Sequence, residues 1–438
     1  MTFDRVAAVE WYRRNRERSR ALFDLIADSA YYSQPIALRH PIVFYEGHLP
    51  GFSFNTLVKK ALGRASIDAR LESLFARGID PHENSGGSGG SGTVGGWPSR
   101  DEVRRFADEA DRHVVDALEQ DDLERRGDPL LDRADAVFTI LEHEAMHQET
   151  LLYMWHRLPL EQKRAPAGYR PTLDGAPPRQ EWIDVPPGCA TLGVARGAVR
   201  FGWDNEFPAF SAQVAPFSIE RHDTSNAQFL EFVDAGGYAN REVWRPEDWA
   251  WIERERIAHP LFWERHGDRW MWRGMFELAP LPPAWPVYVS QAEAAAYARW
   301  RGMRLPTEAE FQRAAFGSPE GERVHPWGDA PPDRSRGAFD FESWDPQPAG
   351  AHPKGESAWG VADLVGNGWE WTSTTFGPFP GFHAMPSYPE YSADFFDGEH
   401  VVMKGASPAT ARELLRPSFR NWFRTRYPYV YATFRCAR

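Results

Sequence analysis

Two histidines at helical spacing carry the strongest chemical signal in this 438-residue sequence. His143 and His147 lie four residues apart in the segment His-Glu-Ala-Met-His. Residues at this spacing share one face of an α-helix, so both imidazoles could bind a single metal ion. Histidines at this spacing can also be solvated or separately hydrogen-bonded, so a metal site needs a further ligand.

His48 is the candidate for that third ligand. It lies in the segment Phe-Tyr-Glu-Gly-His-Leu-Pro, near the start of a predicted helix that could face the helix of His143. Three histidines leave coordination positions open, as a catalytic metal site requires. Glu149 points away from the histidine face and is expected to support the ligands rather than bind the ion. Spacing alone does not distinguish Fe(II) from Zn(II) or Ni(II).

Four helices are predicted in the first 160 residues, and they would position these histidines. Apolar residues recur there at helical spacing. Ser99 and Glu102 form a capping-box pattern, and Asp128 before Pro129 is typical of a helix start. The predicted helices are Asp4–Ala27, Pro41–Leu62, one that begins at Ser99, and one from Asp128 to Trp155. Four amphipathic helices favour a helical bundle.

The composition changes after Leu160, where short β-type runs and dense Gly and Pro replace the helical pattern. Residues 161–179 are expected to link a domain of residues 1–160 to a mixed domain of residues 180–438. The fold class is therefore α+β. The Gly/Ser-rich segment 84–96 is predicted to be a flexible loop. The predicted strands are Trp182–Val185, Ala198–Phe201, Val287–Val289 and Val401–Lys404.

Composition and charge exclude several classes of protein. Lys and Arg number 50 against 62 Asp and Glu, a net charge of −12, and this acidic balance argues against nucleic acid as the partner. Only Cys189 and Cys436 are present, which excludes a disulfide framework and a cysteine-ligated zinc site. No apolar run approaches the length of a membrane helix, and the charged first residues do not resemble a signal peptide. The expected location is the cytoplasm, with no membrane partner.

Five short motifs follow the three histidines in a fixed order. Together with the His-x3-His-x-Glu pattern, they resemble the EgtB-type nonheme iron sulfoxide synthases, which make ergothioneine. The resemblance implies a DinB-like four-helix bundle followed by a formylglycine-generating-enzyme-like domain of the C-type-lectin-like mixed fold. The motifs are Phe201–Glu206 (FGWDNE), Thr224–Phe229 (TSNAQF), Arg304–Glu310 (RLPTEAE), Gly366–Trp371 (GNGWEW) and Phe434–Arg438 (FRCAR).

The resemblance also implies an activity and roles for particular residues. In that family three histidines hold Fe(II), O2 is the cosubstrate, and a thiol is joined to imidazole C2 of hercynine (trimethylated histidine). His48, His143 and His147 take the position of the iron ligands. Asn421 and Trp422 match part of the motif that lines the hercynine site, although Trp422 could equally be a core aromatic. A tyrosine after the Trp-Glu-Trp motif donates a proton or electron in bacterial members, and Tyr388 and Tyr391 are the candidates.

The sequence departs from the ergothioneine pattern on the side of the second substrate. Phe423 stands where an acidic residue meets the ammonium of γ-glutamylcysteine, and Met146 stands where a Gln is common. The predicted loop Glu72–Asp80 also differs from the ergothioneine type. These departures resemble the selenoneine synthase branch, SenA, whose members join hercynine to a selenosugar. Arg77 and Arg420 are the residues that could bind a charged second substrate, and Arg424 and Arg426 could do the same.

Two alternatives stay open at this stage. An ergothioneine-type enzyme that uses a cysteine-derived thiol keeps the same iron chemistry. A non-catalytic binding or scaffold protein keeps the fold alone. A formylglycine-generating enzyme itself needs a cysteine pair at its copper site, which Cys189 and Cys436 do not resemble.

Overall fold

The computed structural model describes residues 3–76 and 96–438. The chain divides into two units. The first contains Met1–Tyr169 together with Pro386–Tyr388, and the second contains Arg170–Met385 and Pro389–Arg438. The chain therefore returns to the first unit for three residues late in the sequence.

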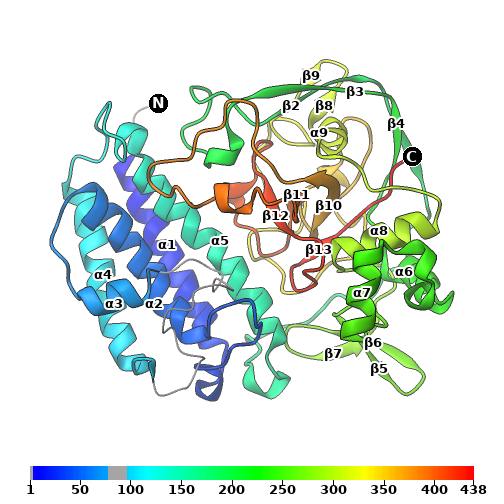
Figure 1. The fold of residues 1–438 in the computed structure, drawn as a ribbon, viewed down its shortest axis with the longest axis horizontal. Coiled ribbons are helices and arrows are strands. Elements are labelled where there is room, and N and C mark those ends of the chain that lie inside the picture. The colour runs from blue at the N-terminus through cyan, green and yellow to red at the C-terminus, as the bar shows by residue number, and fades with distance from the viewer. Residues whose placement is uncertain (1–2, 77–95) are drawn as a thin grey trace. The chain divides into compact units, whose positions relative to one another are not determined.

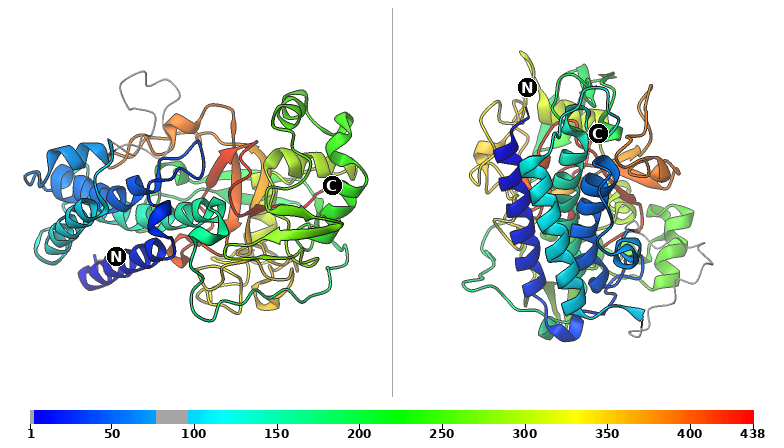
Figure 2. Two further views of the ribbon diagram at one scale, coloured as in Figure 1. Left: turned by 90° about the horizontal axis from the view of Figure 1, so that it is seen from below. Right: turned by 90° about the vertical axis from the view of Figure 1, so that its left-hand side faces the viewer.

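Long helices form the first unit, as the sequence predicts (Figure 1). Helices α1 and α2 each pack against both α4 and α5, and α1, α4 and α2 run side by side in the right-hand view of Figure 2. The helices are α1 (Arg5–Asp24), α2 (Ile42–Ser53), the short α3 (Ala69–Leu74), α4 (Arg100–Gln120) and α5 (Asp135–Arg157).

Capping and apolar burial explain where these helices form. Asp4 accepts a hydrogen bond from the amide of Ala7, and Ser99 accepts one from the amide of Glu102, so α1 and α4 begin at the predicted residues. The inner faces of the helices share a core that includes Val114, Leu118 and Ile140. The predicted bundle is therefore confirmed.

The predicted start of the last bundle helix at Asp128 was wrong. The Asp128 side chain accepts hydrogen bonds from the amides of Leu130 and Leu131, which caps a turn rather than a helix. Arg133 and Ala134 then adopt the left-handed conformation, with φ of 59° and 60°, so α5 begins only at Asp135.

Two further details of the first unit differ from the prediction. The second helix continues past Ser53, but Phe54–Ala61 is a π-helix rather than an α-helix. Glu72 does not lie in a loop, because the Asp68 side chain caps a short helix there, α3. Neither change was visible in the residue pattern.

The second unit contains small sheets, four helices and much irregular chain. Its largest sheet has the strand order β12-β11-β10-β13, in which β13 pairs parallel with β10 and the other neighbours pair antiparallel. Those strands are β10 (Gly368–Thr375), β11 (His400–Ala406), β12 (Asn421–Arg424) and β13 (Ala432–Thr433).

Smaller sheets and helices complete this unit. The smaller sheets are β1 (Trp182–Val185) with β4 (Phe217–Glu220), β2 (Gly188–Leu192) with β3 (Phe210–Val214), β5 (Trp263–His266), β6 (Arg269–Arg273) and β7 (Leu278–Pro280), and β8 (Gly317–Ser318) with β9 (Gly321–Glu322). The helices are α6 (Asn226–Asp234), α7 (Pro246–Glu255), α8 (Gln291–Trp300) and α9 (Glu308–Phe316).

Two of the four predicted strands are confirmed, as β1 and within β11. The run Ala198–Phe201 is not a strand, because the amide of Ala198 turns back to the carbonyl of Ala195. The run Val287–Val289 is not a strand either, because its amides donate to two different segments, at the carbonyls of Thr224 and Ala432, so no ladder forms. Within the described residues, no helix is long and apolar enough to cross a membrane.

Candidate functional site

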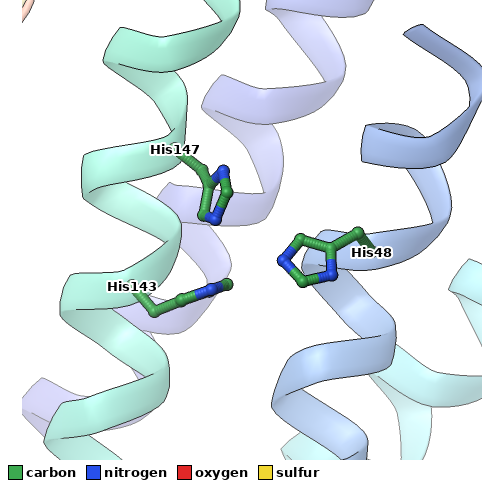
Figure 3. A group of neighbouring side chains, drawn as sticks. All are labelled: His48, His143 and His147. Carbon is green, nitrogen blue, oxygen red and sulfur yellow. The ribbon is translucent and has the colours of Figure 1, made fainter. Parts of the chain in front are cut away.

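Three histidine side chains meet inside the first unit (Figure 3). His143 and His147 project from one face of α5, and His48 points toward them from α2. The three ring centroids lie between 4.4 and 5.2 Å apart. One ligand atom from each residue lies within 4.8 Å of the other two, a spacing that could hold a metal ion.

Burial sets the protonation state of the three imidazoles. None is more than 2% exposed. Burial lowers the pKa of His48 to about 4, and it moves the pKa values of His143 and His147 well below their ordinary value. The rings are therefore neutral at pH 7, and a neutral imidazole offers a lone pair to a metal.

Most ring nitrogens of the three histidines have no protein partner. Nε2 of His48 and both nitrogens of His143 and His147 are buried, with no hydrogen-bond partner among the described residues. An unsatisfied buried polar group costs about 1–3 kcal/mol, so this arrangement is favourable only with a bound ligand. The donor set fits a divalent transition metal with imidazole ligands, a class that includes Fe(II).

His48 is oriented by a hydrogen bond to the backbone. Its Nδ1 lies 2.7 Å from the carbonyl oxygen of Phe75, which requires the proton on Nδ1 and leaves the lone pair of Nε2 available to a metal ion. The ring of Phe75 packs against Gly47, where a Cβ would lie 2.4 Å from the ring. Glycine before His48 is therefore needed for this hydrogen bond.

The face of α5 behind His143 and His147 carries a buried polar network. Glu144 accepts hydrogen bonds from Arg16 (2.8 Å) and from the Ser19 hydroxyl (2.7 Å). Arg16 also pairs with Asp111 on α4 at 2.8 Å. The network connects α1, α4 and α5, and it fixes the rotation of the helix that presents His143 and His147.

Of the two candidate tyrosines, Tyr388 lies beside the histidines. It belongs to the three residues that return to the first unit. Its ring centroid is 6.1 Å from that of His143 and 5.2 Å from that of Phe52. Tyr391 belongs to the second unit, where it stacks on Trp203 at 3.9 Å.

Trp422 is part of an aromatic cluster in the second unit. Its indole stacks on Phe376, with centroids 4.2 Å apart and ring planes 5° from parallel. Tyr391 meets it edge-on at 5.2 Å, and the ring of Phe395 is tilted against it at 5.7 Å. The indole is half-buried, so it is not a fully enclosed core residue.

Asn421 and Phe423 lie on either side of Trp422 in β12. Both are half-buried. The side-chain oxygen of Asn421 accepts a hydrogen bond from the amide of Trp422 at 2.9 Å. Phe423 stacks on Tyr427, with centroids 5.1 Å apart and planes 17° from parallel.

Arg77 and Arg420 are two of the four arginines that the sequence suggests for a charged second substrate. Arg77 lies outside the described residues. Arg420 is 3% exposed, and its guanidinium makes two hydrogen bonds to Glu308, at 2.8 and 3.1 Å. It also donates to the carbonyl of Gly377 at 3.0 Å. Arg420 is therefore occupied within the fold, and we do not assign it to a substrate.

Sequence reasoning missed Phe52 and Phe376, each of which stacks on a residue that it named. Phe52 lies four residues after His48 in a predicted helix, so helical spacing could have placed it beside the site. Phe376 offers no comparable signal, because its contact partner Trp422 lies far from it in the sequence.

Comparison with known proteins agrees with this two-part organisation. Residues 12–151 match the DinB superfamily, and residues 171–438 match the sulfatase-modifying factor enzyme 1-like domain.

Individual relatives match across much of the chain. A hercynine oxygenase of Mycolicibacterium thermoresistibile is 36% identical over 332 residues, which are 73% of this chain and 71% of that protein. A hercynine oxygenase of Mycolicibacterium smegmatis is 37% identical over 65% of this chain and 67% of that protein. Ergothioneine biosynthesis protein 1 of Schizosaccharomyces pombe is 29% identical over 91% of this chain and 52% of that protein. The chain therefore belongs to the EgtB-type hercynine oxygenase family, with a DinB-superfamily domain followed by a sulfatase-modifying-factor-like domain.

Proposed function

We propose that the chain is a nonheme Fe(II) enzyme that uses O2 to join imidazole C2 of hercynine to a chalcogen atom of a second substrate. The observation that carries the proposal is the group of three buried, neutral histidines with unused ring nitrogens, in a chain similar to hercynine oxygenases. Fe(II) held by His48, His143 and His147 would supply the site of O2 activation. Replacing a C–H and a chalcogen–H bond by a carbon–chalcogen bond removes two electrons and two protons, and O2 takes up both.

Asn421 and Trp422 are the residues that we assign to hercynine. An indole face attracts a trimethylammonium group, which carries a positive charge and no hydrogen-bond donor. Phe376 covers one face of the Trp422 indole, and Tyr391 meets it edge-on, so the ring is held in a defined orientation. An indole held in this way presents a fixed surface to a ligand.

Tyr388 is the residue that we assign as proton or electron donor. Its ring lies 6.1 Å from that of His143, whereas Tyr391 is stacked on Trp203. A donor must lie near the reacting atoms, either directly or through one water molecule. The position of Tyr388 therefore supports it over Tyr391 for this role.

We propose a selenosugar as the second substrate, as in the selenoneine synthase branch, with formation of a carbon–selenium bond. Phe423 cannot neutralise the ammonium of an amino-acid thiol, and an unpaired buried charge costs several kcal/mol. Phe423 and Tyr427 instead form a stacked pair of rings. An aromatic surface of this kind suits a neutral sugar.

A second candidate is an ergothioneine-type reaction with a cysteine-derived thiol. The relative named ergothioneine biosynthesis protein 1 favours it, as do the half-buried arginines Arg424 and Arg426 at and just after the end of β12. The side chain of Arg424 is 43% exposed, and its ion pair with Glu399 is long, at 3.8 Å. It could bind a substrate carboxylate.

Competition between a selenosugar and γ-glutamylcysteine tests the choice of second substrate. The wild-type chain should convert the selenosugar preferentially, and Phe423→Asp should shift the preference toward γ-glutamylcysteine by about tenfold or more, since one charge-assisted contact contributes about 1.5–3 kcal/mol. Phe210→Asp, at an exposed phenylalanine of the same unit, is the matched control and should leave the preference unchanged. Preferential use of γ-glutamylcysteine by the wild type would show that the second substrate is a thiol and not a selenosugar.

A further inference from the structure

One face of α5 carries more than the two histidines. Asp135, Thr139, His143 and His147 follow one another at intervals of four residues, so they form a single stripe along the helix. His143 and His147 are the proposed metal ligands. Asp135 and Thr139 instead contact the returning segment Pro386–Tyr388 of the same unit.

Ser387 is at the centre of that contact. Its hydroxyl donates a hydrogen bond to Oδ2 of Asp135 at 2.7 Å. Oγ1 of Thr139 lies 3.0 Å from the same hydroxyl and shares its one proton between Ser387 and the carbonyl oxygen of Asp135, at 2.9 Å. Ser387 is 4% exposed and Thr139 is fully buried. Buried hydrogen bonds hold their partners in place, because the loss of one partner leaves the other buried polar group unsatisfied, at a cost in free energy.

The backbone of the same segment is also held. Lys60, in the π-helix Phe54–Ala61, donates from Nζ to the carbonyl oxygens of Pro386 (3.0 Å) and Ser387 (3.3 Å). The segment is therefore fixed through its side chain by α5 and through its carbonyls by the π-helix. Its position relative to α5 is set by the hydroxyl of Ser387.

The spacing along α5 relates this anchor to the histidines. Thr139 and His143 are one helical turn apart, about 5.4 Å along the axis. Ser387 binds beside Thr139, and the next residue, Tyr388, has its ring 6.1 Å from that of His143. Successive residues of the segment thus meet successive turns of the helix.

We propose that Ser387 is a positioning residue, which holds Tyr388 beside the metal-binding histidines through Asp135 and Thr139. The inference rests on the proposed role of Tyr388 as donor. Within the described part of the chain, Ser387 makes no hydrogen bond to the three histidines, so it would act only through Tyr388. Its effect on turnover should vanish when the phenol of Tyr388 is removed.

A double-variant kinetic experiment tests this dependence. Ser387→Ala should lower kcat by roughly 10- to 100-fold with little change in KM for hercynine, because a displacement of about 1 Å can cost 100-fold. Thr139→Val, which keeps the shape of the side chain, should act in the same direction, and Ser387→Thr should retain turnover. On a Tyr388→Phe background, Ser387→Ala should cause no further loss. An equal loss on both backgrounds, or none on either, would overturn the proposal.

A spectroscopic readout measures the position of Tyr388 without turnover. The chain is labelled with fluorotyrosine, and the Tyr388 resonance is the one that disappears in Tyr388→Phe. Co(II) added to the histidine site should broaden this resonance strongly in the wild type and less in Ser387→Ala. Thr150→Val, which removes another threonine hydroxyl of α5, should match the wild type. Unchanged broadening in Ser387→Ala would contradict the proposal.

Hydrogen exchange of the metal-free chain separates this inference from the proposed function. The peptide that contains residues 386–388 should exchange faster in Ser387→Ala than in the wild type or Thr150→Val. Faster exchange in Ser387→Ala, together with no hercynine turnover by the wild type, would support the contact of Ser387 with Asp135 and Thr139 and contradict the proposed activity. Unchanged exchange in Ser387→Ala would reject the anchor.

Discussion

The ring of Phe52 lies face to face with the imidazole of His143, with centroids 3.5 Å apart and planes 10° from parallel. Phe44 stacks in a similar way on His48, at 4.8 Å and 19°. Metal-binding histidines are usually oriented by a hydrogen bond from the second ring nitrogen. Within the described residues, only His48 has such a bond, so ring stacking takes over this task for His143.

Replacement of Phe52 should therefore weaken metal binding. Phe52→Leu removes the stacked ring but keeps an apolar side chain, and we expect the affinity for Fe(II) or Co(II) to fall by about tenfold or more, as for other supporting groups of metal ligands. Titration of the metal-free chain measures this. Phe138→Leu, whose ring packs on Phe3 and Trp11 of the same unit, should keep the wild-type affinity. Equal affinities for both variants and the wild type would remove Phe52 from the site.

Gly47 should be sensitive to the smallest possible enlargement. Alanine is normally favoured over glycine in a helix by about 1 kcal/mol. Here the new Cβ would lie 2.4 Å from the Phe75 ring, and overpacking of this kind costs about 1–3 kcal/mol. Gly47→Ala should lower both stability and metal affinity, because displacement of Phe75 also moves the carbonyl that orients His48.

The matched control for Gly47 lies one turn away in α2. At Gly51 a Cβ would approach no atom closer than 3.4 Å, which is an ordinary contact. Gly51→Ala should leave the free energy of unfolding unchanged or raise it. If chemical denaturation shows the same change in the free energy of unfolding for both variants, the contact with Phe75 does not restrict the side chain at position 47 to glycine.

The polar network behind α5 should contribute strongly to stability. Arg16→Met leaves Glu144 buried without its cation, while Asp111 keeps only its ion pair with the half-exposed Arg20, and this should lower the free energy of unfolding by about 3–5 kcal/mol. Arg13→Met is the control on the same helix, because the pair of Arg13 with Glu119 is exposed and should contribute less than about 1 kcal/mol. Similar denaturation midpoints for the two variants would contradict the importance of the network.

Glu72 should make stability depend on pH in the acid range. Burial raises its pKa, but the Lys59 ammonium, the Ser66 hydroxyl and two backbone amides outweigh burial and hold the pKa at about 2, below its ordinary value of 4.5. The folded chain therefore binds this proton less readily than the unfolded chain. The stabilisation is complete above about pH 4.5 and is lost as the pH falls toward 2.

Glu72→Gln should remove this part of the pH dependence. Between about pH 5 and pH 3, the free energy of unfolding should fall less steeply for the variant than for the wild type. Urea denaturation at a series of pH values measures both slopes. Parallel slopes would show that the carboxylate of Glu72 is not held in its charged form by the fold.

The histidines could be predicted from the sequence because their signal is local or periodic. His143 and His147 follow the helical repeat, and His48 was placed on a helix that could face them. The helix start at Asp128 was predicted from an equally local pattern, yet the left-handed residues Arg133 and Ala134 displaced it to Asp135. A capping pattern does not reveal whether the following residues continue the turn.

The remaining parts of the site depend on long-range contacts. Sequence reasoning could not choose between Tyr388 and Tyr391, because the choice depends on which three residues return to the first unit. The ion pair of Arg420 with Glu308 joins residues 112 positions apart, so Arg420 looked available for a substrate. Asp135 and Thr139 carried a visible spacing, but their partner Ser387 lies about 250 residues later, which explains why the stripe was not recognised.

The most direct test of the central claim is iron-dependent turnover of hercynine. The chain is loaded with Fe(II) under anaerobic conditions, mixed with hercynine and a selenosugar or γ-glutamylcysteine, and exposed to O2, and the products are read by mass spectrometry. We predict a hercynine adduct bonded through the chalcogen in the wild type, and none in His48→Ala, His143→Ala or His147→Ala. His113→Ala, at a half-buried histidine of α4 outside the group of three, should retain turnover. Unchanged hercynine with both donors in the iron-loaded wild type, or adduct formation by the histidine variants, would contradict the account.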